Sequence, residues 1–209
     1  MMTQTPRMLV MLSGGGTTLQ NFIDLIDAGE LPVTIVGVIS SRKDAYGLVR
    51  SEKHGIPTTI VARKEFDTWE AFNEALCKAV DSYQPELIGM AGFMSLFRPG
   101  PRYNGKILNV HPALIPAFCG KGLYGHHVHE AVIESGVRIT GATVHFADEE
   151  YDRGPIIIQK AVEVLDDDTA DSLAERVQTV EREIYPEAIR LYATGRLRIE
   201  GRRVRILPT

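Results

Sequence analysis

The first half of the chain alternates between short apolar runs and longer stretches in which apolar residues recur every three or four positions. Short runs rich in β-branched residues are typical of buried strands, and the longer spacing is typical of helices that cover a sheet. The pattern predicts strands at 8–12, 33–39, 56–61, 87–91 and 106–110, and helices at 17–28, 45–54 and 67–83. Strands and helices that alternate in this way form a parallel sheet with helices on both faces.

The second half of the chain has a different pattern. Strand-like runs at 138–146 and 156–164 flank a polar turn, and a short helix is expected at 128–134. A long amphipathic helix is expected from 168 to about 194, and a hairpin at 199–206 around Gly201. We therefore expect an α/β fold with an open, mostly parallel twisted sheet of the Rossmann-like class. One domain would span 1–209, with halves at about 8–105 and 106–197 and a tail at 198–209.

Composition excludes several classes of protein. Hydrophobic residues make up 44% and charged residues 24% of the 209 positions, which is typical of a folded globular chain. The net charge of −4 argues against nucleic acid as a partner, because duplex binding depends on a basic field. No apolar run is long enough for a membrane span or a signal peptide. Cys77 and Cys119 form no CxxC pair, so we expect a reduced, cytoplasmic protein.

A glycine loop follows the first predicted strand, with the sequence Ser-Gly-Gly-Gly-Thr-Thr at 13–18. Free N–H groups at the start of the next helix, aided by the helix dipole, favour an anion there. Gly15 and Gly16 allow close approach, and Thr17 and Thr18 can add hydroxyl donors. Leu19 replaces the third glycine of a dinucleotide fingerprint, and no Gly-Lys-Ser/Thr follows. The loop predicts a site for the phosphate of a small molecule, unless the glycines serve only a tight turn.

Asn109 and His111 lie at the end of the fifth predicted strand. Residues two apart on a strand share a side, so an amide donor and an imidazole point together. This pair could stabilise an oxyanion, and Asp152, in the later polar turn, could exchange protons or hold a histidine charged. Without a serine elbow or a reactive cysteine, the chemistry would be direct transfer. The alternative is a capped strand end and an unrelated acidic turn.

The histidine-rich segment 119–129 raises the question of a metal site. His127 and His129 would share a face on a strand, but the pattern around them is helical, so they point apart. No carboxylate stands at a known metal-binding spacing. We expect no metal and assign the segment to local packing and substrate contact.

Several stretches together resemble the folate-dependent phosphoribosylglycinamide formyltransferases of purine biosynthesis. They are LSGGGTTLQ at 12–20, AGFM at 91–94, LNVHPALIP at 108–116, VHF at 144–146, DRGP at 152–155, RVQTVE at 176–181 and IYP at 184–186. The resemblance runs from about 8 to about 197. Its Asn-x-His-Pro motif with a later Asp is shared by all formyl-tetrahydrofolate transferases. The glycine loop, the length and the Gln178/Glu181 pair narrow the acceptor to glycinamide ribonucleotide.

This resemblance implies a reaction and a set of site residues. The formyl group of the co-substrate 10-formyltetrahydrofolate would move to the amine of glycinamide ribonucleotide. Asn109 and a protonated His111 would stabilise the oxyanion, and Asp152 would support that charge and relay protons. The residues that would hold the ribonucleotide are Gly15, Gly16, Thr17, Thr18, Gln178 and Glu181. Those that would contact the folate are Phe93, Met94, Leu96, Phe97, Asp148 and Glu149.

The chain departs from the family where Thr17 and Thr18 replace a common Ser-Asn, and where Trp69 and Ser95 replace arginines near the folate. Two related enzymes are alternatives: a formyl-tetrahydrofolate hydrolase, which usually has an extra N-terminal domain, and a methionyl-tRNA formyltransferase, which needs a C-terminal domain and a basic face. A non-catalytic module that binds a phosphosugar or folate is a third. We expect small molecules as partners, neither nucleic acid nor membrane, and leave a homodimer open.

Overall fold

In the computed structural model, which describes residues 5–208, the chain divides into two compact units. The N-terminal unit ends at Leu108 and the C-terminal unit begins at Asn109. Residues 1–4 and 209, which the expected domain includes, lie outside the described part. No helix between residues 5 and 208 is both long and apolar enough to cross a membrane.

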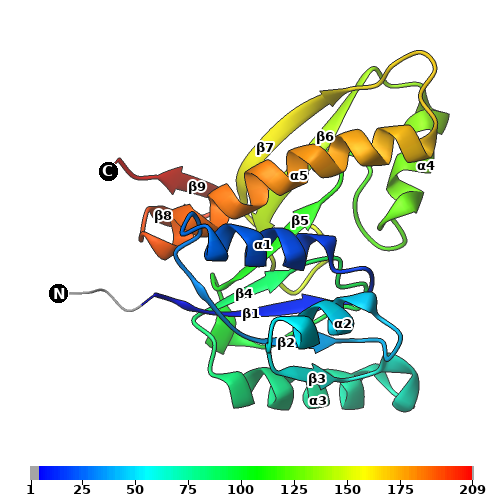
Figure 1. Cartoon of the computed structure of the whole chain (residues 1–209). Helices are drawn as coiled ribbons and strands as arrows, with labels where there is room; N and C mark the ends of the chain where they lie inside the picture. Colours follow the sequence, from blue (N-terminus) through cyan, green and yellow to red (C-terminus); the bar gives the residue numbers. More distant parts are fainter. Residues whose placement is uncertain (1–4, 209) are drawn as a thin grey trace. The chain divides into compact units, whose positions relative to one another are not determined.

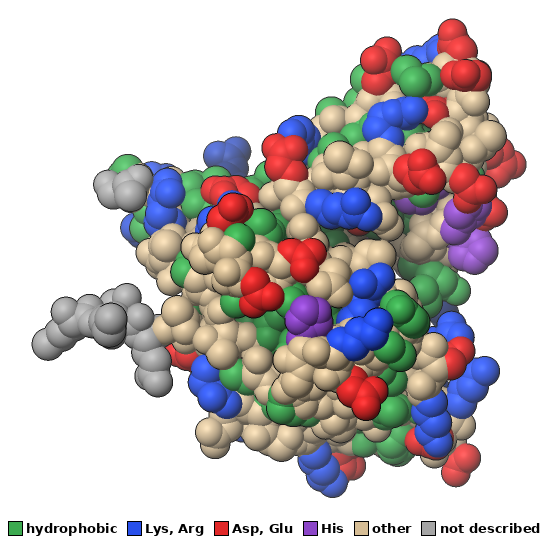
Figure 2. Space-filling view, viewed as in Figure 1, with side chains coloured by type: hydrophobic (Ala, Val, Ile, Leu, Met, Phe, Trp, Pro, Cys, Tyr) green, Lys and Arg blue, Asp and Glu red, His purple; other side chains and the backbone are tan. Residues whose placement is uncertain are grey.

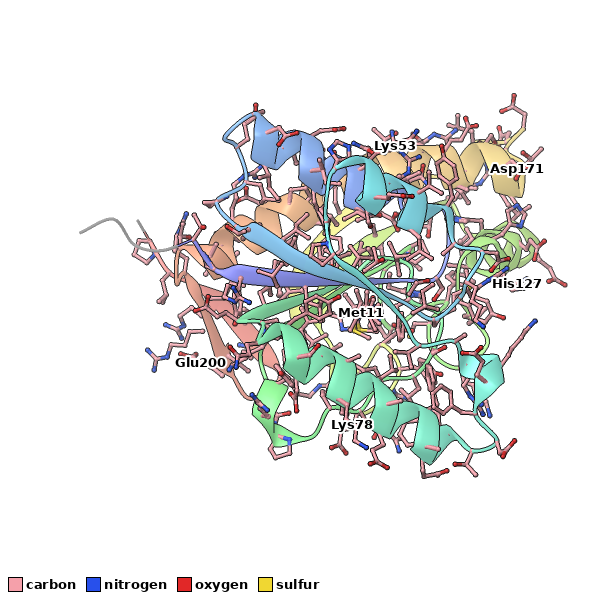
Figure 3. All side chains as sticks on the ribbon, turned by 60° about the horizontal axis from the view of Figure 1, so that its bottom comes forward. Met11, Lys53, Lys78, His127, Asp171 and Glu200 are labelled. Carbon is pink, nitrogen blue, oxygen red and sulfur yellow. The ribbon has the colours of Figure 1, made fainter. Side chains whose placement is uncertain are left out.

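The N-terminal unit is built on parallel strands in the order β3-β2-β1-β4. These strands are β1 (Arg7–Leu12), β2 (Thr34–Ser40), β3 (Thr58–Ile60) and β4 (Leu87–Met90). Figures 1 and 3 show two helices on one face of this sheet and the third on the other. The two are α1 (Thr17–Asp27) and α2 (Tyr46–Lys53), and the third is α3 (Trp69–Tyr83). The predicted parallel sheet with helices on both faces is thus confirmed.

Two glycines let these helices approach the strands closely. A Cβ added to Gly37 of β2 would run into the ring of Tyr83 at the end of α3. A Cβ on Gly47 of α2 would come within 2.5 Å of the Leu12 side chain. Apolar faces complete the packing, because both α1 and α3 bury a helical stripe of side chains. These are Leu19, Phe22 and Ile23 of α1, and Phe72, Leu76 and Val80 of α3.

The C-terminal unit contains the antiparallel elements. β5 (Ile107–His111) carries the chain into it, and the order of its later strands is β6-β7-β9-β8. The elements are α4 (His126–Ser135), β6 (Ile139–Phe146), β7 (Ile156–Glu163), α5 (Ala170–Ala193), β8 (Leu197–Glu200) and β9 (Arg203–Ile206). Pairs β6–β7 and β8–β9 are antiparallel and β7–β9 is parallel. α5 packs along β6 and β7 (Figure 1), and the predicted terminal hairpin is confirmed.

Some predicted boundaries differ from the structure. The third strand is shorter than predicted. The structure also contains two 3-10 turns that the sequence pattern does not predict, Arg63–Glu65 and Pro101–Tyr103. α3 begins two residues later than the helix predicted at 67–83, because its N-cap is Thr68, whose Oγ1 accepts a hydrogen bond from the Ala71 N–H at 3.1 Å. This shift places Trp69 first in the helix, where its Nε1–H donates to the Leu96 carbonyl at 3.3 Å. A tertiary contact therefore sets a boundary that the local pattern leaves open.

Candidate active site

The glycine loop presents backbone N–H groups at the start of α1. Gly16 is the N-cap in a left-handed conformation, with φ of 70°, and no side chain caps the helix. The Gln20 N–H makes a helical bond to the Gly16 carbonyl at 3.0 Å, so the N–H groups of Thr17, Thr18 and Leu19 have no carbonyl partner within the helix. Thr17 is exposed and Thr18 is half-buried. The helix start is therefore shaped for an anionic group.

The ends of three strands of the N-terminal unit meet at Ser13. The Ser13 hydroxyl, at the end of β1, is hydrogen-bonded to the Ser41 hydroxyl after β2 at 2.6 Å. It also accepts from the Met94 N–H at 2.9 Å, and the Ser13 N–H donates to the Gly92 carbonyl at 3.0 Å. Ser13 thus fixes the glycine loop against the segments that follow β2 and β4.

The segment after β4 carries the residues expected to contact folate. Met94 is 47% exposed, Phe93 and Leu96 are half-buried, and Phe97 is buried, so only the first three offer side-chain surface. Trp69, which stands where the family often has an arginine, holds this segment through the Leu96 carbonyl.

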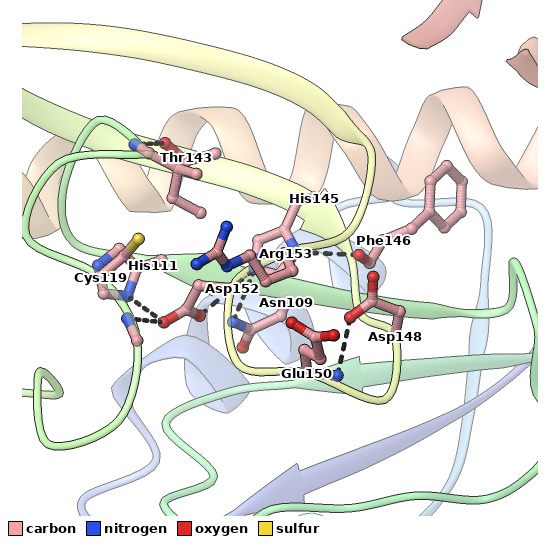
Figure 4. Close-up of polar contacts among 12 residues, drawn as sticks. Asn109, His111, Cys119, Thr143, His145, Phe146, Asp148, Glu150, Asp152 and Arg153 are labelled. Atoms are coloured by element: carbon pink, nitrogen blue, oxygen red, sulfur yellow. Dashed lines mark hydrogen bonds and ion pairs between the residues drawn. The ribbon is translucent and has the colours of Figure 1, made fainter. Parts of the chain in front are cut away.

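Four polar side chains of the C-terminal unit form a buried cluster (Figure 4). The Asn109 amide Nδ2 lies 3.1 Å from Nε2 of His145. Asp152 has one carboxylate oxygen 3.7 Å from Nδ1 of His111 and the other 3.7 Å from Nε2 of His145. His111 is 4% exposed and His145 is 1% exposed. The three residues that the sequence predicted to act together therefore do lie together, namely Asn109, His111 and Asp152.

The ring of His111 has a defined orientation. Its Nε2 lies 2.8 Å from the Phe118 carbonyl. A carbonyl only accepts, so Nε2 carries a hydrogen and Nδ1, which faces Asp152, is the nitrogen that gains or loses the proton. Burial lowers the pKa of His111 below its ordinary value, although the charge of Asp152 and the Phe118 carbonyl both raise it. A pKa below the ordinary value of 6.5 leaves the ring mostly neutral at pH 7 in the protein alone, because burial disfavours the charged form. The protonated ring that the resemblance implies for the reaction stays a prediction.

Asp152 is held as a carboxylate. Burial raises its pKa, but contact with His145, the charge of His111 and the Gly120 N–H together bring it below its ordinary value. The Gly120 N–H donates to Oδ2 at 2.9 Å. Asp152 itself has φ of 55° and Phe118 has φ of 49°, a left-handed region that only glycine adopts freely. Both residues that contact His111 are therefore strained, and such strain clusters at functional sites.

His145 is the fourth member of the cluster. Its Nδ1 lies 2.9 Å from the Phe146 carbonyl, and its Nε2 lies 3.1 Å from the Asn109 amide nitrogen and 3.7 Å from a carboxylate oxygen of Asp152. The contact with His145 uses one N–H of the Asn109 amide and leaves the second available as a hydrogen-bond donor. The signal in the sequence was the VHF stretch at 144–146, but no spacing rule links it to a residue 36 positions away.

The other predicted residues of the C-terminal unit lie on α5 and in the turn between β6 and β7. Gln178 is exposed on α5, and its Oε1 accepts from Arg182 at 3.0 Å. Glu181 lies one turn further on and is half-buried, and burial raises its pKa to about 7 against the opposing charge of Arg182. Asp148 and Glu149 are exposed in the turn between β6 and β7, where Asp148 accepts from the Glu150 N–H at 3.0 Å.

Histidine and acidic side chains meet at the surface over α4 (Figure 2). His126 bonds through its two ring nitrogens to Glu130 at 3.1 Å and to Asp171 at 2.9 Å, while His127 bonds to Glu130 at 3.0 Å. His129 is buried on another side of the helix, as helical spacing predicted. Within residues 5–208, no three His, Cys, Asp or Glu side chains form a group that could hold a metal ion.

Known proteins are similar to this chain in sequence and in fold. A family model described as Formyl transferase matches residues 6–189. The chain is 37% identical over 193 residues to the phosphoribosylglycinamide formyltransferase of Escherichia coli, covering 91% of this chain and 89% of that protein. It is 39% identical over 196 residues to the trifunctional purine biosynthetic protein adenosine-3 of Bos taurus, covering 92% of this chain but only 19% of that longer protein.

A solved structure agrees with these relatives. The crystal structure of glycinamide ribonucleotide transformylase 1 from Symbiobacterium toebii superposes with a TM-score of 0.90 and 43% identity, covering 98% of this chain and 95% of that one. The expected α/β formyltransferase fold is confirmed by this likeness and by the family match. The chain is an enzyme of the formyl transferase family and belongs, within it, to the phosphoribosylglycinamide formyltransferases.

Proposed function

We propose that the protein transfers the formyl group of 10-formyltetrahydrofolate to the amine of glycinamide ribonucleotide, as a cytoplasmic enzyme of purine biosynthesis. The observation that carries this proposal is the buried cluster of Asn109, His111 and Asp152, with His145 behind the amide. The cluster combines a hydrogen-bond donor, a titrating imidazole and a carboxylate. Those three groups suit attack by an amine on a formyl carbon without a covalent enzyme intermediate.

The proposed chemistry follows from the states of these side chains. The amine nitrogen bonds to the formyl carbon, and the formyl oxygen becomes an oxyanion that the free N–H of Asn109 stabilises. The growing negative charge raises the pKa of His111, so the ring takes up at Nδ1 the proton that the attacking amine gives up, while Asp152 balances its charge. The oxyanion then re-forms the carbonyl as the bond from carbon to the folate nitrogen breaks, and the proton held on His111 passes to that nitrogen. A neutral resting His111 suits this role, because a group must accept a proton before it can return one.

The proposed binding residues divide by ligand. The N–H groups and hydroxyls of the glycine loop would bind the ribonucleotide phosphate, through Gly15, Gly16, Thr17 and Thr18. Gln178 and Glu181 would bind its sugar and glycinamide end, and a carboxyl with a pKa of about 7 can serve there as donor or acceptor. The exposed surface of Phe93, Met94 and Leu96, together with the turn at Asp148 and Glu149, would contact the folate.

An acceptor assay tests this proposal. Purified protein is given 10-formyltetrahydrofolate with and without glycinamide ribonucleotide, and loss of the formyl-folate is followed by absorbance. We expect turnover only when the ribonucleotide is present. Equal loss without it would identify a hydrolase, and tight binding of either ligand without turnover would identify a binding module.

A further inference from the structure

The backbone of the glycine loop rests on α2. The Gly47 N–H donates to the Gly14 carbonyl at 3.1 Å, and Nε of Arg50 donates to the Gly15 carbonyl at 2.9 Å. A Cβ on Gly16 would lie 2.6 Å from the Gly47 Cα, so the two backbones are in direct contact. One helix therefore holds two successive carbonyl groups of the loop.

These two contacts decide where the N–H groups of the loop point. In a planar trans peptide, the C=O and the following N–H point in opposite directions. Because the carbonyls of Gly14 and Gly15 are turned toward α2, the N–H groups of Gly15 and Gly16 point away from it. A Cβ placed on Gly14 or Gly15 would meet no atom within 4 Å, so this part of the loop borders open space. If either carbonyl turned round, its oxygen would face the anion and repel it.

Arg50 is fixed in this position by further contacts. Nη1 donates to Oε1 of Gln20 on α1 at 3.2 Å, and the guanidinium carbon lies 5.1 Å from the centre of the Tyr46 ring. Within the described part of the chain, no carboxylate lies at ion-pair distance from Arg50. Its positive charge is therefore not cancelled by a bonded acid, and it lies beside the exposed loop.

We propose that Arg50 is a positioning residue for the phosphate site, and that its charge adds to the affinity of the loop for a phosphate monoester. This inference rests on the proposed function, which places the ribonucleotide phosphate at the loop. Arg50 acts through the Gly15 peptide, which it keeps turned so that the N–H groups face the ligand. Loss of Arg50 would therefore weaken binding of the phosphorylated substrate and leave the chemistry of the buried cluster unchanged.

The test compares three variants in the full chain. Arg50→Gln removes the charge and the planar fork, and Arg50→Lys keeps the charge but loses the fork geometry. Lys53→Gln is the matched control, since it removes a charge from the same helix one turn away (Figure 3) and contacts none of the loop residues described here. KM for the ribonucleotide, KM for the folate and kcat are measured for each. Calorimetry measures binding of the ribonucleotide, and inorganic phosphate is titrated as a competing inhibitor.

We expect Arg50→Gln to raise KM for the ribonucleotide and the inhibition constant of phosphate by about tenfold, the scale of one lost charged hydrogen bond. Its KM for folate and its kcat should stay within about twofold of the wild-type values. Arg50→Lys should give intermediate values, and Lys53→Gln should match the wild type. A general loss of structure would lower kcat and change both KM values. A change confined to KM for the ribonucleotide is therefore distinguishable from it. If Arg50→Gln unfolds on heating well below the wild type, Arg50→Lys decides the question by the same split.

The results distinguish failure of the role of Arg50 from failure of the proposed function. If the wild type binds the ribonucleotide and phosphate but Arg50→Gln binds them equally well, the role of Arg50 is refuted and the proposed function stands. If Arg50→Lys and Arg50→Gln lower kcat with no change in KM for the ribonucleotide, the role is likewise refuted. If the wild type binds neither ligand, the phosphate site itself is absent, and the proposed function falls together with this inference.

Discussion

The glycine loop and the buried cluster differ in what they are made of. The loop of the N-terminal unit offers backbone N–H groups at an exposed helix start, and its side chains are nearly absent. The cluster of the C-terminal unit consists of side chains, with two almost fully buried histidines beside the half-buried Asn109 and Asp152, and the backbone is strained at Phe118 and Asp152. Backbone groups suffice to hold an anion whose charge does not change. Proton transfer needs side chains whose pKa values burial and neighbours can shift.

This difference predicts which changes are costly. In the cluster, each side chain fixes the protonation or orientation of another, so one substitution disturbs several groups. In the loop, the backbone N–H groups would bind the ligand. A substitution there is therefore costly when it moves the backbone and has little effect when it alters only a side chain. This explains how Thr17 and Thr18 can stand in place of the family's common Ser-Asn.

The largest effect is expected for Asp152→Asn. The amide removes the carboxylate that faces Nδ1 of His111, so the ring can no longer be stabilised in its charged form. We expect kcat to fall by at least about a hundredfold, the scale of a lost acid or base group. Glu150→Gln, in the same turn but exposed and with no role assigned to its side chain, serves as control and should retain kcat. Near-normal turnover in Asp152→Asn would remove this carboxylate from the mechanism.

Gly16→Ala tests the backbone of the loop. Its φ of 70° and the contact with Gly47 leave no room for a Cβ, so we expect unfolding in urea to require about 2 kcal/mol less free energy. Gly15→Ala is the control: its Cβ would meet nothing within 4 Å, and its stability should stay within about 0.5 kcal/mol of the wild type. Equal stabilities for the two variants would contradict the close contact between the loop and α2.

The titration of Glu181 gives a test by pH. Its pKa is about 7 in the folded protein against an ordinary value of 4.5, so the folded state binds more protons than the unfolded state between these values. Glu181 therefore makes stability fall as pH rises from about 4.5 to 7. Glu181→Gln should remove part of this fall, of order 1 kcal/mol, in urea melts at several pH values. Parallel stability curves for the two proteins would show that burial does not raise this pKa.

The smallest effect is expected for Thr17→Ala. The backbone N–H remains and only one exposed hydroxyl is lost, so KM for the ribonucleotide should rise by only about threefold. An increase of a hundredfold would mean that side chains, and not the backbone, bind the phosphate, and would erase the contrast between the two regions.

Sequence pattern predicted the parts of the molecule that depend on local order. Local sequence is enough to predict the alternation of strands and helices and the glycine loop before α1. The period of two residues along a strand likewise places Asn109 and His111 on the same side. The neutral state of His111 could not be predicted in the same way. It depends on burial, which arises only when distant segments pack around the ring and which outweighs the opposing effects of Asp152 and the Phe118 carbonyl.

Other differences have the same origin. His145 orients Asn109 across 36 positions of sequence, and no propensity connects the two. Thr68 caps α3, so the helix begins two residues later than predicted, with Trp69 against the Leu96 carbonyl. Each of these features is set by tertiary contacts, which override a local preference worth about 1 kcal/mol or less.

The central claim, direct transfer of a formyl group to an amine, can be tested by following the formyl carbon itself. 10-Formyltetrahydrofolate labelled with carbon-13 at the formyl group is mixed with glycinamide ribonucleotide and the protein, and the products are read by NMR. We expect the label to appear as a formamide on the ribonucleotide, in step with the loss of formyl-folate. Label that accumulates as free formate, with the ribonucleotide unchanged, would contradict it.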